Sequence, residues 1–152
     1  MTKPSLRKLA LAVALTAAAS TASATLAVHE FFADANLSVD ALGVDGAGNG
    51  IISAEVASGS TVLRACLYTA DVWGGGVSPV IFNGTLLNPA MGTLLAPNAN
   101  PANTIRYDVT ALIKPVIDGG MGGIYGFSLK EEGDNDGSVL VVVYSNASTM
   151  GG

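Results

Sequence analysis

The stretch Val139-Leu140-Val141-Val142-Val143-Tyr144 decides the fold class, because all six residues are apolar and four of them are β-branched. A short run of this kind predicts a central β-strand that is covered on both faces. Shorter strand patterns precede it, separated by turns rich in glycine and asparagine. These strands are expected at residues 37–41, 51–56, 61–69, 77–82, 104–107 and 125–129. The spacing predicts an all-β protein with an antiparallel β-sandwich, of the jelly-roll or immunoglobulin-like type.

Alternation of apolar and polar side chains marks individual strands. The run Leu37-Ser38-Val39-Asp40-Ala41 alternates fully and predicts a half-buried strand. In the strand at 61–69, the residues Leu63, Ala65 and Leu67 share one face. We expect this leucine face to lie in the core.

One short helical turn is expected beside these strands. Asp108 can cap a turn at Val109–Lys114, and Pro115 is expected to end it. The turn is a minor element in an otherwise all-β chain.

The first 24 residues have the features of a cleavable secretory signal peptide, with a signal helix. Lys3, Arg7 and Lys8 form a basic region, Leu9–Ala19 is apolar, and Ala22-Ser23-Ala24 is a small-residue cleavage site. We therefore expect a secreted protein, extracellular or at the cell surface, with periplasmic transit in a Gram-negative cell. No later stretch reaches the length of about 20 apolar residues that a membrane-spanning helix needs.

Residues 25–152 are expected to form a single β-sandwich domain. The turn-like segment Ser145–Gly152 follows directly after the most hydrophobic strand. A sandwich usually supplies further strands beside such a strand, because an uncovered edge invites aggregation. We therefore expect the domain to be incomplete at its C-terminus, as the N-terminal part of a longer reading frame.

The net charge narrows the classes of partner. The chain carries a formal net charge of −5, and the segment after residue 24 keeps four basic and all twelve acidic residues, a charge of −8. An acidic protein repels nucleic acids and anionic lipids, so neither is an expected partner. Cys66 is the only cysteine, which excludes an intramolecular disulfide, and we expect it to be a small buried apolar residue.

Residues for catalysis are scarce. A Ser or Cys triad needs a histidine base, and the only histidine, His29, lies at the start of the mature chain. A glycosidase needs only two carboxylates, but no spacing selects a pair among the candidates. The candidates are Glu55, Asp71, Asp118, Glu131 and Glu132. The sequence therefore predicts no catalytic residues and no enzyme.

An acidic turn is the one candidate for a metal site. Glu131, Glu132, Asp134 and Asp136 fall within one short turn, and calcium prefers carboxylate and carbonyl oxygens. The spacing differs from that of an EF-hand, so a solvated hairpin turn is the competing interpretation. Calcium is the only cofactor that the sequence suggests.

Trp73 is the one large aromatic residue expected in a loop, followed directly by three glycines. It could stack on a sugar ring or a partner surface, or it could cap the end of the core. Both interpretations remain open at this point.

Several segments carry a family resemblance. They are residues 57–68 (ASGSTVLRACLY), the strand ending in Phe82-Asn83-Gly84, residues 107–113 (YDVTALI) and residues 136–144 (DGSVLVVVY). In this order they resemble a family of secreted bacterial β-sandwich domains in surface-sorted proteins, of the PEP-CTERM type or related cell-surface and matrix proteins. The resemblance implies a structural or adhesive role, with surface polysaccharide or other matrix proteins as partners. The C-terminal Pro-Glu-Pro motif, transmembrane helix and basic tail of PEP-CTERM-type members have no counterpart here, which implies truncation or free secretion.

Three functions are therefore expected, in this order. The first is a secreted, non-enzymatic structural or adhesive module of the cell surface or extracellular matrix. The alternative is a carbohydrate- or calcium-binding module that uses Trp73 or the acidic turn. The third is a small secreted hydrolase.

Overall fold

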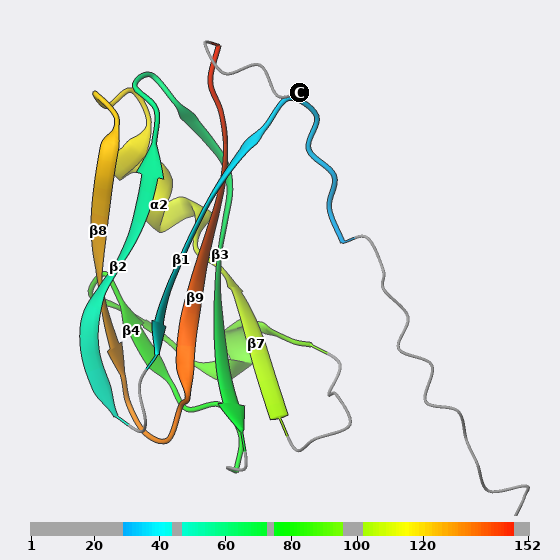
Figure 1. The fold of residues 1–152 in the computed structure, drawn as a ribbon. Helices are drawn as coiled ribbons and strands as arrows, with labels where there is room; N and C mark the ends of the chain where they lie inside the picture. Colours follow the sequence, from blue (N-terminus) through cyan, green and yellow to red (C-terminus); the bar gives the residue numbers. More distant parts are fainter. Residues whose placement is uncertain (1–28, 44–46, 73–74, 96–101, 148–152) are drawn as a thin grey trace, which may run out of the picture. The chain divides into compact units, whose positions relative to one another are not determined.

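The computed structural model describes residues 29–43, 47–72, 75–95 and 102–147. The predicted signal helix at 1–24 lies outside these residues. In the unit Phe32–Gly152, the described strands form two antiparallel sheets that pack face to face (Figure 1). The predicted all-β sandwich is confirmed. None of the helices in these ranges has the length and apolar character needed to cross a bilayer.

The two sheets are called sheet A and sheet B below. Sheet A has the order β1 (Asn36–Gly43), β9 (Gly137–Ser145), β3 (Thr61–Val72), β7 (Ala102–Asp108) and β6 (Thr93–Leu94). Sheet B has the order β2 (Gly48–Val56), β8 (Gly123–Glu131), β4 (Val80–Phe82) and β5 (Thr85–Leu87). The 3-10 helix η1 (Pro89–Met91) and the helix α2 (Thr110–Ile117) complete the described elements.

Strand β9 is central in sheet A, as its sequence predicts, and has β1 on one edge and β3 on the other. Its coverage on both faces is not confirmed. Leu140 and Val142 are fully buried against sheet B, whereas Val139, Val141 and Val143 are only half-buried on the outer face. The reason is that the sandwich has two layers, so the outer side of sheet A has no third layer against it.

Strand β1 turns its apolar side outward. Leu37 is 61% exposed and Val39 is 55% exposed, while Ser38 and Asp40 are half-buried. A half-buried strand usually directs its apolar side to the core. Here the inward positions of β1 face the edge of β2, where backbone N–H groups require acceptors, and polar side chains meet that need.

The leucine face of β3 is only partly in the core. Ala65 and Leu67 are fully buried, but Leu63 is 38% exposed and Val62 is buried in its place. The register between β3 and β9 shifts between Val62 and Arg64, which makes Leu63 the extra residue of a β-bulge. Simple alternation fails at a bulge because the strand gains one residue relative to its neighbour.

Helix α2 is longer than its sequence suggests. The helix begins at Thr110, so its N-cap residue is Val109 rather than the predicted Asp108, which lies one residue earlier and accepts a hydrogen bond from the Thr110 N–H at 3.0 Å. The prediction that Pro115 ends the helix is wrong, because the helix continues to Ile117. Ile113 and Ile117 lie four residues apart, on one side of the helix, and both are buried in the core. Burial of Ile117 compensates for the backbone hydrogen bond that proline cannot donate.

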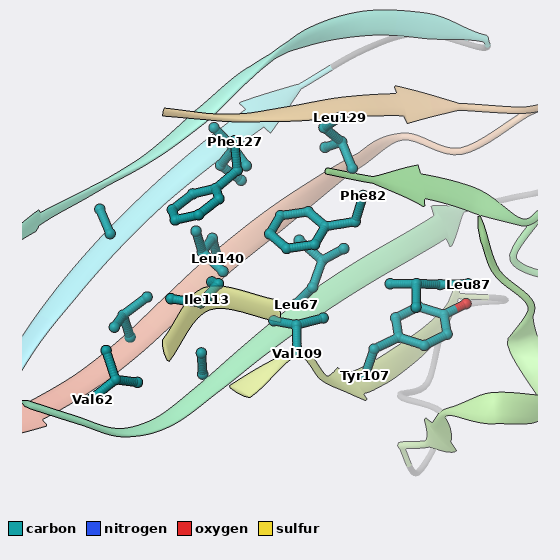
Figure 2. Close-up of a cluster of buried hydrophobic side chains, with 14 of the residues drawn as sticks. Val62, Leu67, Phe82, Leu87, Tyr107, Val109, Ile113, Phe127, Leu129 and Leu140 are labelled. Carbon is teal, nitrogen blue, oxygen red and sulfur yellow. The ribbon is translucent and has the colours of Figure 1, made fainter. Parts of the chain in front are cut away.

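The core lies between the sheets and is closed by α2 (Figure 2). Phe82 and Phe127 of sheet B stack with their ring centroids 5.7 Å apart. Leu67 and Leu140 contribute from sheet A, and Ile113 from α2. This packing fixes the two sheets against each other and so positions their edge strands β1 and β2.

Candidate functional site

The acidic turn is divided between the core and the surface. Glu131 is fully buried, and its Oε1 accepts a hydrogen bond from Ser138 Oγ at 2.7 Å. Its Oε2 is buried without a hydrogen-bond partner. Burial raises the pKa of Glu131, the hydrogen bond from Ser138 opposes that rise, and the negative charge of Asp136 adds to it. Glu131 is therefore a core residue of β8 rather than a solvated turn residue.

The other acidic residues of this turn point to different partners. Glu132 pairs with Lys130, with 2.6 Å between Oε1 and Nζ. Asp136 accepts a hydrogen bond from the Val72 N–H at the end of β3, and Asp134 is exposed. Within the described ranges, no group of three or more His, Cys, Asp or Glu side chains could hold a metal ion. The structure therefore does not bring the four predicted calcium ligands together.

Two of the carboxylates considered for glycosidase chemistry serve the fold. Asp71 is buried and accepts a hydrogen bond from the Gly76 N–H at 3.0 Å. Asp118 accepts one from the Val62 N–H at 2.7 Å and also pairs with Lys114. Burial acts to raise the pKa of Asp118, but these hydrogen bonds and the Lys114 charge outweigh it and lower the pKa. Both side chains tie loops to strand or helix ends.

Three further residues were singled out by the sequence, namely His29, Cys66 and Trp73. Trp73 lies outside the described residues. His29 Nε2 lies 3.8 Å from Glu30 Oε1 in the short described part of the unit Met1–Phe31. Cys66 is buried, as predicted, and lies in β3 directly opposite Val141 of β9.

A row of aliphatic side chains on sheet A forms a surface that we call the apolar face. Its members are Leu37, Val39 and Ala41 of β1 and Val139, Val141 and Val143 of β9. The sheet register places them directly opposite one another across the two strands, as Leu37 with Val143, Val39 with Val141 and Ala41 with Val139. No charged side chain interrupts the row. Alternation in the sequence reveals both strands, but the outward direction of the row depends on the packing.

Strands β1 and β2 form edges of the two sheets and run in opposite directions (Figure 1). A groove is lined by residues of both strands. Its volume is about 710 Å³. Two hydrogen bonds bridge it, because Asp40 Oδ2 accepts from the Ser53 N–H at 2.7 Å and Ser38 Oγ accepts from the Glu55 N–H at 2.9 Å. Its lining consists of Leu37, Ser38, Val39, Asp40, Ser53, Glu55, Val56, Ala57, Ile124 and Tyr144. Sequence reasoning missed this groove, since it forms only where two sheets meet.

Comparison with protein-family models, with curated proteins and with solved structures found no match to this chain. The apolar face and the groove are therefore the observations from which a function can be inferred.

Proposed function

We propose that the protein is a secreted, non-enzymatic structural or adhesive module of the cell surface or extracellular matrix, and that it assembles through its apolar face. The apolar face is the observation that carries this proposal. Single exposed apolar residues are common on protein surfaces, but a contiguous apolar row is typical of an interaction site. The signal-like segment at residues 1–24 supports an extracellular location.

A second copy of the chain is the partner that fits this surface. Most homo-oligomers use two-fold contacts, in which the same patch of each copy faces the other. The outward positions of β1 and β9 carry only aliphatic residues, glycine and serine, and Arg64 of β3 lies at their margin, opposite Val143. Two copies can therefore meet over these two strands without burying a charge at the centre of the contact. Strand β1 also ends sheet A, which leaves this side of the molecule accessible.

A lysine on the apolar face should weaken self-association. Full burial of a valine contributes about 1.5 kcal/mol. Val39 is 55% exposed, so its burial in a contact contributes about 0.8 kcal/mol, which corresponds to about fourfold in a dissociation constant. A two-fold contact contains each residue twice, so the lost burial alone should weaken self-association by about fifteenfold in Val39→Lys. The lysine charge placed in the contact should weaken it further in both Val39→Lys and Val141→Lys.

Sedimentation velocity over a range of protein concentrations tests the proposal. We expect the wild-type protein to form dimers or larger assemblies as its concentration rises, and both lysine variants to remain monomeric. Ile51→Lys is the matched control, because Ile51 is 62% exposed on the outer side of sheet B. Circular dichroism checks that each variant is folded. A wild-type protein that stays monomeric throughout, or an equal loss in Ile51→Lys, contradicts the proposal.

A further inference from the structure

The groove lies where the edge strands of the two sheets, β1 and β2, run beside each other, and we call this line of contact the seam. At one end of the seam, the side chain of Leu42 in β1 packs against Gly50 of β2. The two are so close that a Cβ added at Gly50 would lie 2.6 Å from Leu42 Cδ2. Further along, the side chains of Ser38 and Asp40 bridge the two edges. No backbone ladder joins β1 to β2 in the described sheets. The seam therefore opens into a groove where the two edges are held apart.

Both walls of the groove present backbone groups. In an antiparallel pair, alternate residues direct their N–H and C=O groups away from the partner strand. The N–H groups of Ser53 and Glu55 point to β1, so the carbonyls of the same residues point away from β8 as well. On the other wall, the Ala41 N–H bonds to Asp40 Oδ1 rather than to β9, which indicates that Val39 also directs its backbone groups away from β9.

The dimensions suit an extended chain. The wall of the groove formed by Leu37–Asp40 is four residues of β1, about 13 Å at the usual rise of a strand. The N–H groups of Ser53 and Glu55 are already held by side chains of β1. A segment of four or five residues would therefore lie beside this wall and donate its own N–H groups to the carbonyls of the same two residues, as in peptide recognition by strand addition.

The side chains select for positive charge. Asp40 and Glu55 line the groove, and its lining contains no Lys, Arg or His. In the described residues, the ion pairs of Lys and Arg use Asp108, Asp118 and Glu132 instead. The aliphatic residues Val39 and Ile124 also line the groove. This arrangement is complementary to an extended segment in which aliphatic and basic residues alternate.

We propose that the groove between β1 and β2 binds an extended peptide segment of a partner protein, with a Lys or Arg side chain beside Asp40 and Glu55. The site shares β1 with the apolar face but has sheet B as its other wall. It therefore does not depend on the proposed self-association.

Short peptides with blocked ends test this proposal, with binding followed by the amide chemical shifts of the labelled protein. The peptide Val-Lys-Val-Lys-Val is expected to shift the amides of Val39, Ser53 and Glu55. Val-Glu-Val-Glu-Val carries the opposite charge, and Val-Lys-Pro-Lys-Val lacks the central N–H needed for strand pairing. Both should bind several-fold more weakly.

Variants of exposed residues complete the test without disturbing the fold. Glu55→Gln should weaken binding of the lysine peptide by about two- to fivefold, the range for one exposed ion pair. Glu132→Gln, at an exposed carboxylate outside the groove lining, is the matched control and should bind as the wild type does. All titrations are repeated with Val141→Lys, so that failure of the self-association proposal does not affect them.

Three results would overturn the proposal. The first is equal binding of the lysine and glutamate peptides, and the second is equal binding of the proline peptide. The third is a set of groove shifts that appears with rising protein concentration alone, which would make a second copy the occupant.

Discussion

Replacement of the buried Glu131 by glutamine should change how stability depends on pH. The side chain is fully buried, one oxygen has no hydrogen-bond partner, and its pKa is raised, chiefly by burial. Above the ordinary value of 4.5, the unfolded chain releases this proton while the folded protein retains it. Stability is therefore complete below the pKa of the unfolded chain and is lost as the pH rises toward the folded pKa.

The loss of stability is the amount expected when one group, Glu131, binds a proton in the folded protein but not in the unfolded chain. Between the two pKa values, the free energy of unfolding falls by about 1.4 kcal/mol for each pH unit. With a urea m-value of about 2 kcal/mol/M, the midpoint falls by about 0.7 M per pH unit. Glu131→Gln cannot ionise but keeps the amide oxygen that accepts from Ser138, so its midpoint should stay constant over the same range.

Urea unfolding between pH 5 and pH 8 measures this difference. The lowered pKa values of Asp108 and Asp118 place their titration below 3.8, so these groups do not contribute in this range. Glu132→Gln is the matched control, because Glu132 is exposed and pairs with Lys130, and its curve should parallel that of the wild type. A wild-type midpoint that does not fall above pH 5, or an equal fall in Glu131→Gln, would refute the reasoning.

Two further predictions concern the β-bulge and the seam. Leu67→Ala should lower the free energy of unfolding by about 2–5 kcal/mol because Leu67 is fully buried, whereas Leu63→Ala at the bulge should cost less than about 1 kcal/mol. Urea unfolding measures both, and equal losses would contradict the bulge. Asp40→Ala removes the acceptor of the Ser53 N–H and should cost about 1–2 kcal/mol. Amide exchange at Ser53 should then accelerate relative to Ala54, which pairs with β8, and an unchanged Ser53 rate would count against the bridge.

The candidate sites were less accessible to sequence reasoning than the fold. Clustering of Glu131, Glu132, Asp134 and Asp136 in the sequence suggests a shared ligand, but a strand ends inside this cluster. Glu131 is the last residue of β8 and points inward, while Asp136 turns to β3. The groove unites Asp40 and Glu55 from two different sheets, and no sequence motif marks that pairing.

The sequence by itself determined that the chain is all-β, that residues 139–144 form a central strand, and that a helical turn follows Asp108. These properties are local, because alternation, β-branching and capping act over a few neighbouring residues. Only the tertiary structure decided which side of each strand is buried. A strand has two faces that differ in polarity, but the neighbours it meets decide which face turns inward. This is why Leu37 and Val39 lie outside, why Val62 replaces Leu63 in the core, and why Ser38 and Asp40 of β1 turn toward β2.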